Sequence, residues 1–298
     1  MPLQNAQLAT GSRQHAREPI PLPGDSCLSW VTRGANFVVV VSRASDGAVL
    51  ERDNPDEYVL LLPDTPSLAA TVDAAGSVVA GDSVRAQADS LTVVPPGKSR
   101  ITVAGAGLVV RIFSSDATDL AARADNAQTY AEPNPLVAPL VAWPDPPDGF
   151  RLRHYRLADY ARGDSNMRIF RTTKLMVNPL MKRTTPRDVH KLTPHTHADF
   201  EQGSLALGGR YVHHLRYPWG PDMALWQDDQ HMEMGSPSLL VVPPTVVHTS
   251  RNIGDEPGVL VDIFAPPRWD FSRKGSVCNA DEYPMPPEPA TATAAASK

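Results

Sequence analysis

The heptapeptide SLTVVPP at residues 90–96 returns as SLLVVPP at residues 238–244, with six of the seven positions identical. Each copy follows a glutamate at a similar distance, since Glu57 lies 38 residues before Pro95 and Glu201 lies 42 residues before Pro243. Two matched features at one spacing indicate a duplicated unit. A chain of 298 residues is long enough for two domains of ordinary size. We therefore expect two copies of one fold.

Short β-branched runs, closed by Gly, Pro, Asp or Ser, occur in both halves, as expected for short strands. The 30 prolines and 19 glycines supply many turns between them. Regularly spaced short strands are typical of sandwich or barrel domains, so the pattern predicts an all-β protein. The clearest runs are NFVVVVSR (36–43), EYVLLLP (57–63), GLVVRIFSS (107–115), MRIFRTTKLMV (167–177), GRYVHHLRY (209–217) and GVLVDIFAPP (258–267).

The segment between the halves has a different composition. SDATDLAARADNAQTYA (115–131) predicts one short helix with Ser115 or Asp116 as its N-cap. The following stretch, 132–150, is rich in proline and predicts an extended linker. We expect an N-terminal extension (1–24), an N-terminal domain (25–115), a helix and linker (116–158), a C-terminal domain (159–275) and a tail (276–298).

The charge balance restricts the class of partner. A formal net charge of −5 and a pI of about 6.0 give no broad basic surface for nucleic acid or an anionic membrane. No run approaches the roughly 18 apolar residues of a membrane span, and the N-terminus has no apolar signal region. We expect a cytoplasmic protein whose partner is a small molecule, with no nucleic-acid and no membrane partner.

The segment PHTHADFEQGSLALGG (194–209) gathers groups that bind metal ions. On an extended chain His195 and His197 share one face, and Glu201 joins them if the alternation continues. A lone His-x-His pair is more often a surface or packing feature, but PPTVVHTSRN (243–252) adds His248. Imidazoles and a carboxylate suit Fe, Mn, Ni, Co or Zn. We expect His195, His197, Glu201 and His248 to bind one metal ion.

These two segments resemble the motifs of the cupin superfamily, G-x5-H-x-H-x3-4-E-x6-G and G-x5-P-x-G-x2-H-x3-N. The first matches from His195 to Gly208, with Val189 at the place of its leading glycine. In the second, Pro237 and Thr245 stand where the family has glycine, while Pro243, His248 and Asn252 match.

The resemblance implies two double-stranded β-helix (cupin, or jelly-roll) barrels in tandem, a bicupin. It also implies one divalent transition metal ion per chain, held in the C-terminal barrel. Iron is the first expectation, with Mn, Ni, Co or Zn as alternatives.

The N-terminal copy lacks this chemistry. When the halves are overlaid, Glu51, Asp53, Glu57 and Arg100 fall at the positions of His195, His197, Glu201 and His248. An arginine there repels a cation and can pair with the carboxylates. We interpret this pocket as structural, with a bound anion or polar ligand as the alternative.

Alternation along GGRYVHHLRYPWG places Tyr211, His213, Leu215, Tyr217 and Trp219 on one, more apolar, face. We expect this face to point into the barrel. His213 and Tyr211 are then candidate catalytic proton donors or acceptors, and the alternative is that they are hydrogen-bonded core residues. Trp226, Gln227 and His231 are weaker candidates of the same kind.

The preferred function is a metal-dependent dioxygenase acting on a small organic molecule. In that scheme the substrate and O2 occupy the open positions of the ion. The same ligands also support a lyase or isomerase, in which the ion acts as a Lewis acid. A third possibility is a non-catalytic protein that binds a sugar or a small acid. Exposed sheet edges of such barrels favour a homodimer.

Overall fold

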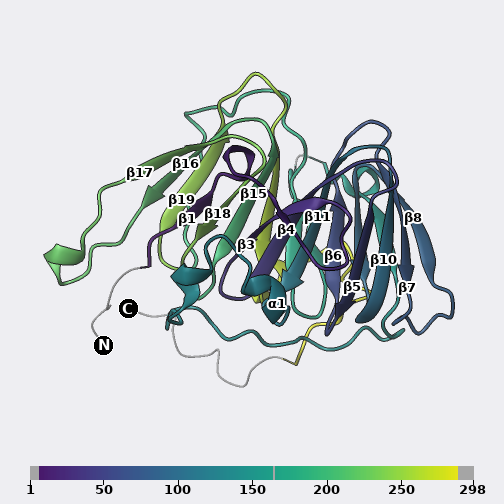
Figure 1. Cartoon of the computed structure of the whole chain (residues 1–298). Helices are drawn as coiled ribbons and strands as arrows, with labels where there is room; N and C mark the ends of the chain where they lie inside the picture. The colour runs from purple at the N-terminus through teal and green to yellow at the C-terminus, as the bar shows by residue number, and fades with distance from the viewer. Residues whose placement is uncertain (1–6, 164, 288–298) are drawn as a thin grey trace.

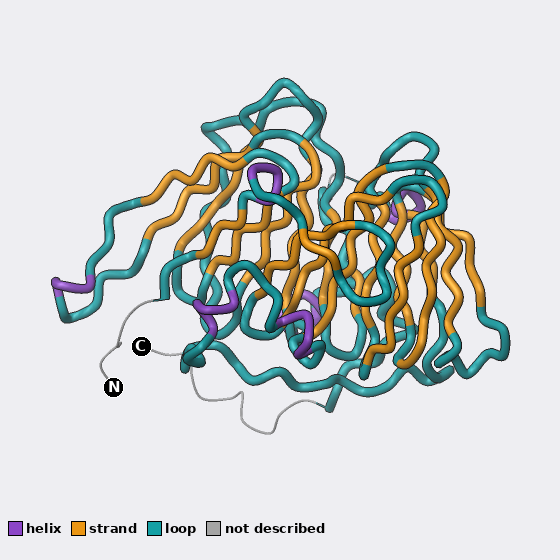
Figure 2. Tube along the Cα trace, viewed as in Figure 1, coloured by secondary structure: helices purple, strands orange, loops and turns teal. Residues whose placement is uncertain are grey.

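The computed structural model describes residues 7–163 and 165–287. Strands dominate the chain (Figure 2), and they form two β-sandwich halves that lie side by side (Figure 1). Each half consists of a larger and a smaller antiparallel sheet. The predicted all-β tandem architecture is confirmed.

The N-terminal barrel consists of a seven-stranded and a four-stranded sheet. The larger sheet has the order β12-β9-β6-β11-β4-β3-β2, with β12 (Arg153–Arg156), β9 (Ser90–Val94), β6 (Tyr58–Leu62), β11 (Gly107–Ser114), β4 (Phe37–Ala44), β3 (Leu28–Arg33) and β2 (Ile20–Pro21). The smaller sheet has the order β5-β10-β7-β8, with β5 (Val49–Asn54), β10 (Gly97–Ala104), β7 (Ala69–Ala74) and β8 (Ser83–Gln87).

The C-terminal barrel consists of a six-stranded and a three-stranded sheet. The larger sheet has the order β1-β18-β15-β20-β14-β13, with β1 (Thr10–Ser12), β18 (Ser238–Val242), β15 (Gln202–Gly208), β20 (Val259–Phe264), β14 (Met176–Pro179) and β13 (Phe170–Arg171). The smaller sheet has the order β17-β16-β19, with β17 (Gln230–Met234), β16 (Tyr211–Arg216) and β19 (Val247–Asn252).

The two larger sheets repeat one topology. The two copies of the heptapeptide form β9 and β18, and each pairs with the strand that follows the matched glutamate, β6 or β15. The next neighbours, β11 and β20, are also equivalent, as are β4 and β14. The duplication inferred from the sequence is therefore present in the fold.

Strand exchange links the halves across the expected domain boundaries. β1, within the expected N-terminal extension, pairs with β18 of the C-terminal barrel. β12, within the expected linker, pairs with β9 of the N-terminal barrel. Each barrel thus receives one strand from the segment that precedes the other barrel. The expected tail is described only as far as residue 287.

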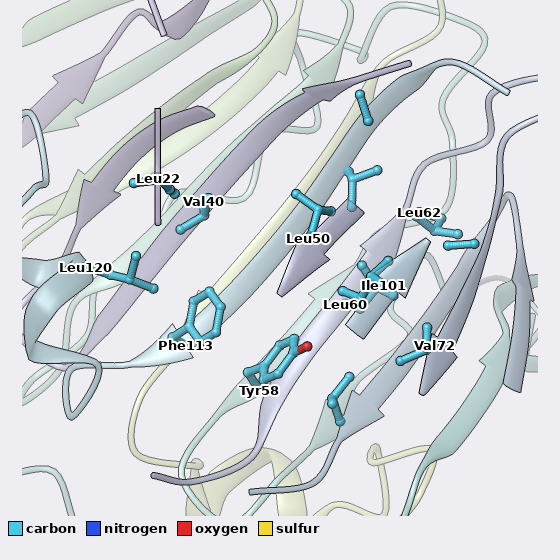
Figure 3. Close-up of a cluster of buried hydrophobic side chains, with 14 of the residues drawn as sticks. Leu22, Val40, Leu50, Tyr58, Leu60, Leu62, Val72, Ile101, Phe113 and Leu120 are labelled. Atoms are coloured by element: carbon cyan, nitrogen blue, oxygen red, sulfur yellow. The ribbon is translucent and has the colours of Figure 1, made fainter. Parts of the chain in front are cut away.

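The cores of the two barrels differ. One continuous apolar cluster, which includes Leu50, Tyr58 and Phe113, fills the N-terminal barrel (Figure 3). A second cluster, including Phe37, Leu205 and Ile263, joins the two larger sheets. The interior of the C-terminal barrel has only three small apolar clusters. Space for a polar site therefore exists in the C-terminal barrel.

The helices are short. The expected 115–131 helix is wrong in length, since α1 (Thr118–Ala121) ends after four residues and the 3-10 turn η2 (Ala127–Tyr130) follows separately. Neither expected N-cap is correct, because Ala117 occupies that position, and Asp116 instead pairs with Lys174.

The remaining helical segments are α2 (Trp269–Arg273) and the 3-10 turns η1 (Gln14–Ala16), η3 (Leu157–Tyr160) and η4 (Met223–Leu225). In the described part of the chain, no helix combines the length and apolarity that a membrane crossing requires.

Candidate metal centre

Three of the four expected ligands meet in the C-terminal barrel. His195 and His197 lie in the segment before β15, and His248 lies on β19. His195 and His248 exchange two backbone hydrogen bonds, of 3.1 and 2.8 Å, as in a short antiparallel pair. One ligand nitrogen from each of the three imidazoles lies within 4.8 Å of the others.

Backbone carbonyls determine which nitrogen two of these imidazoles present. Nδ1 of His195 lies 3.0 Å from the Thr193 carbonyl, and Nδ1 of His248 lies 3.0 Å from the Val246 carbonyl. A carbonyl only accepts, so each Nδ1 carries the proton and each Nε2 has a free lone pair. Nε2 of His248 is buried without a hydrogen-bond partner among the described residues. An unsatisfied buried acceptor of this kind fits a metal ligand.

Burial keeps the enclosed imidazoles neutral. It lowers the pKa of His197 to about 4 and that of His248 to about 3. Neutral imidazole is the form that binds a metal ion. His195 is exposed, His197 is half-buried and His248 is buried, so one side of the cluster is open. The three histidines therefore fit a divalent transition metal ion that has open positions.

The structure does not bring Glu201 to the histidines. The carboxylate accepts hydrogen bonds from the backbone N–H of Ala35, at 2.6 Å, and from the Tyr130 hydroxyl, at 3.2 Å. Both donors belong to segments of the first half of the chain. Residues 198–201 form a loop instead of a continuous strand, so the alternation assumed from His197 to Glu201 fails.

Gln202 occupies the place expected for Glu201. Its Oε1 lies 2.9 Å from Nε2 of His197. The resembled motif allows four residues between its second histidine and its glutamate, and position 202 satisfies that longer spacing. The glycine six residues further on is then Gly209, which has a φ of +85° in the turn between β15 and β16. Thr245, at another glycine position of the motif, also has a positive φ, of 70°.

A cavity of about 340 Å³ opens beside the cluster and is lined by all three histidines and Gln202. Two arginines, Arg183 and Arg187, reach it from the loop after β14. Neither has a carboxylate partner within the described ranges. Burial, followed by the charge of Arg183, lowers the pKa of Arg187. The cavity therefore combines two cationic groups with the imidazole cluster.

One carboxylate lies inside the cavity. Asp262 on β20 accepts hydrogen bonds through Oδ1 from Nε2 of Gln202, at 3.2 Å, and from the Ser204 hydroxyl, at 3.4 Å. Burial raises the pKa of its carboxyl to about 7. Asp262 therefore stands directly behind Gln202, on the side away from His197.

The two expected catalytic residues lie in different places. Tyr211 lines the cavity, and burial raises the pKa of its hydroxyl, so the phenol stays protonated. His213 is buried behind the cavity wall, with Nδ1 2.7 Å from the Ser250 hydroxyl, and burial lowers its pKa to about 4. Tyr211, His213, Leu215 and Tyr217 are all buried, as expected.

Trp219 does not follow the expected inward face, since 70% of its surface is exposed. It stacks on Trp226, with ring centroids 4.3 Å apart, in the long connection between β16 and β17 that projects from the molecule in Figure 1. Trp226 and Gln227 line a different depression, and His231 pairs with His214 at 2.8 Å. These three weaker candidates lie outside the metal-centre cavity.

The predicted equivalence of Glu51, Asp53, Glu57 and Arg100 in the N-terminal barrel to the four expected metal ligands is correct in part. Arg100 pairs with Glu51, as expected, but both side chains are half exposed, and Asp53 is exposed as well. Glu57 is buried, and it accepts hydrogen bonds from the Thr173 backbone and the Tyr283 hydroxyl. The interior of the N-terminal barrel holds the apolar cluster drawn in Figure 3 together with a buried ion pair between Arg111 and Asp25. Among the described residues, only the C-terminal cluster gathers three such ligands.

Sequence reasoning missed four cavity residues: Gln202, Asp262, Arg183 and Arg187. Two signals were available. Asp262 is the single charge in the apolar run GVLVDIFAPP, and Gln202 satisfies the longer spacing of the motif. The arginines follow no periodic pattern, because they lie in the loop that joins β14 to the histidine segment.

Solved structures with a similar fold are oxalate decarboxylases. A formate complex of the Lactobacillus farciminis enzyme has a TM-score of 0.56 and 12% identity, covering 87% of this chain and 86% of that one. The Bacillus subtilis enzyme, described with Mn(II) centres, has a TM-score of 0.56 and 14% identity, covering 87% and 78%. No protein-family model and no curated sequence matches this chain. The chain therefore shares the two-barrel β fold of these enzymes, and its candidate metal centre lies in the C-terminal barrel.

Proposed function

We propose that this protein is a metal-dependent lyase that acts on a small carboxylic acid. One observation carries the proposal: three imidazoles converge on a cavity that also presents two arginines without carboxylate partners. The solved structures of similar fold support the lyase alternative better than the dioxygenase first expected, since they are decarboxylases. Mn(II) in one of them supports manganese over iron as the first metal to test.

The cavity suits a small anion. Its volume of about 340 Å³ is at the lower end for a small-molecule site. Guanidinium groups hold carboxylates through paired, charge-assisted hydrogen bonds. Arg183 and Arg187 would bind and orient one carboxylate of the substrate, which brings its other end toward the histidines.

His195, His197 and His248 would hold the ion. The bound ion supplies Lewis acidity, which stabilises negative charge on a substrate oxygen. Tyr211 presents a protonated hydroxyl to the cavity and would donate a hydrogen bond to the substrate. His213 would act indirectly, by fixing Ser250 on the cavity wall.

The test is CO2 release from protein loaded with Mn(II). Oxalate and other small mono- and dicarboxylic acids are supplied, and metal-free protein is the blank. We expect metal-dependent CO2 release from at least one acid. Tight binding of an acid without turnover would instead support the non-catalytic alternative, and O2 consumption with a substrate would restore the dioxygenase.

Arg183→Met tests the anion site, because no hydrogen bond or ion pair of the Arg183 side chain with another described residue would be lost. A charged hydrogen bond contributes about 1.5–3 kcal/mol, so we expect kcat/KM to fall about 10- to 100-fold. Arg210→Met is the matched control, since Arg210 is exposed, pairs with Glu233 and lies outside the cavity. Equal activity of both variants would contradict the anion site.

A further inference from the structure

The side chain of Gln202 points at the histidine cluster with a defined orientation. Its amide has three polar neighbours: Nε2 of His197 at 2.9 Å, the Ser204 hydroxyl at 3.0 Å and Oδ1 of Asp262 at 3.2 Å. Nε2 of the amide donates to both the Ser204 hydroxyl and Oδ1 of Asp262, so the NH2 group faces Asp262. Oε1 then faces His197. The donor and acceptor pattern thus fixes an oxygen, and not an NH2 group, toward the cluster.

We propose that Gln202 is the fourth protein ligand of the metal ion, through Oε1, and that Asp262 is the residue that holds its amide in the binding orientation. This inference rests on the proposed metal centre. Two ligand atoms that each lie about 2.1 Å from one ion, at a right angle, are about 3 Å apart. Nε2 of His197 donates a hydrogen bond to Oε1 of Gln202 at 2.9 Å. An ion that displaces this proton would meet the two atoms at about that separation.

The alternative ligand is held elsewhere. Both oxygens of Glu201 already accept hydrogen bonds, from Ala35 and Tyr130. Their donors lie at the junction between the barrels, where a Cβ added at Gly34 would fall 2.8 Å from the Glu201 carboxylate. Moving Glu201 to the cluster would leave these half-buried donors unpaired, which costs free energy.

This ligand set has a chemical consequence. Three imidazoles and one amide are all neutral, so a bound divalent ion keeps its full charge of +2. The carboxyl group of Asp262 is one hydrogen bond away from the proposed ligand. Such a centre attracts an anionic ligand more strongly than one with a carboxylate among its ligands. Replacing the neutral amide by a carboxylate, in Gln202→Glu, should therefore raise metal affinity and weaken anion binding.

The experiment measures Co(II) affinity, by competition with a chelator, and the visible absorption of bound Co(II), which reports the coordination number. We expect one Co(II) per chain in the wild type. Gln202→Ala should lower affinity about 10- to 100-fold and change the absorption at saturating Co(II), because one ligand is lost. Gln202→Glu should restore the wild-type coordination number and exceed the wild-type affinity.

Asp262→Asn tests the positioning role. An asparagine can donate as well as accept, so the Gln202 amide is no longer held in one orientation, and affinity should fall. In Gln202→Ala, adding Asp262→Asn should then have no further effect, since there is no amide left to position. Glu201→Gln is the matched control and should keep wild-type affinity and absorption. Thermal unfolding of each metal-free variant shows that it is folded.

The outcomes separate the two proposals. A wild type that binds no Co(II) overturns the metal centre, and this inference with it. A wild type that binds one Co(II), with equal affinity and absorption in Gln202→Ala, overturns only the assignment of Gln202. Loss of the ion in Glu201→Gln together with full binding in Gln202→Ala would assign the ligand to Glu201 instead.

Discussion

At the scale of single residues, a shift of one position along the chain changes which side chain reaches the histidines. Glu201 and Gln202 are neighbours, and neighbours at the start of a strand point to opposite faces. Gln202 faces the barrel cavity with Ser204. Glu201 faces the other barrel, on the same side as Leu205, which packs in the interface cluster. The parity of β15, and not the residue type, therefore decides which of the two side chains faces the histidines.

The number of metal ions bound per chain tests the assignment of the three histidines as ligands. His248→Ala should lose most of its bound metal, because one of three imidazoles and its buried Nε2 are removed. Arg100→Ala should bind as the wild type does, because Arg100 forms a half-exposed ion pair with Glu51 in the other barrel. Elemental analysis gives the answer. Two metal ions per wild-type chain, or a full complement in His248→Ala, would contradict the assignment.

At the scale of elements, the turn between β15 and β16 sets the positions of both Gln202 and Tyr211. Gly209 makes this turn with a φ of +85°. A Cβ added there would lie 2.9 Å from the Asn252 side chain and 3.1 Å from Cα of Gly258. Asn252 itself accepts from the backbone N–H of Arg210 at 3.0 Å. The turn is thus packed tightly against β19 and the segment before β20.

Gly209→Ala should therefore destabilise the protein for two reasons, a positive φ and a steric overlap. We expect the free energy of unfolding to fall by about 2–3 kcal/mol, within the range for strained backbone plus overpacking. Gly47→Ala is the control, because Gly47 has a φ of +76° but nothing within 4 Å of the added Cβ. It should cost about 1 kcal/mol. Chemical denaturation measures both, and equal losses would show that the contact with Asn252 is unimportant.

At the scale of the whole molecule, two equivalent buried carboxylates connect the barrels. Glu201, before β15, accepts from Ala35 and Tyr130, whereas Glu57, before β6, accepts from Thr173 and Tyr283. Each therefore reaches from its own barrel to segments associated with the other half. The matched glutamates of the duplicated sequence therefore both lie at the interface between the barrels.

Glu57 makes the folding stability of the protein depend on pH. Burial raises its pKa above the usual 4.5, although hydrogen bonds from Tyr283 and Thr173 and the charge of Arg153 oppose the change. Between pH 4.5 and the raised pKa, the unfolded chain is ionised while the folded protein keeps the proton. Folding stability therefore falls as pH rises through this window. Urea denaturation across pH should show a smaller decline in Glu57→Gln. An identical slope in both proteins would contradict the raised pKa.

Assembly remains a prediction at this scale. The exposed edges of the sheets and the apolar surface of Trp219 and Met223, 70% and 72% exposed, favour association of two copies. Light scattering at micromolar concentration should give the mass of a homodimer. A strict monomer would contradict it.

The duplication, the all-β class and the grouping of the three histidines can be inferred from local patterns in the amino-acid sequence. These depend on local patterns, namely the repeated heptapeptide, alternation along short strands and the His-x-His spacing. Local patterns persist in the fold because strand periodicity is a property of the backbone. The inward face of Tyr211, His213, Leu215 and Tyr217 was predictable for the same reason.

The rest of the site depends on contacts between segments that are separated in the sequence. The loop of residues 198–201 breaks the alternation, and the half-buried donors of Ala35 and Tyr130, over 70 positions away, hold Glu201 at the interface. The cavity draws Asp262 from β20 and Arg187 from a loop, neither of which is adjacent to the histidines in sequence. The exchange of β1 and β12 likewise depends on which sheet edge each strand meets in space. Such contacts are set by packing between distant segments, which no local pattern encodes.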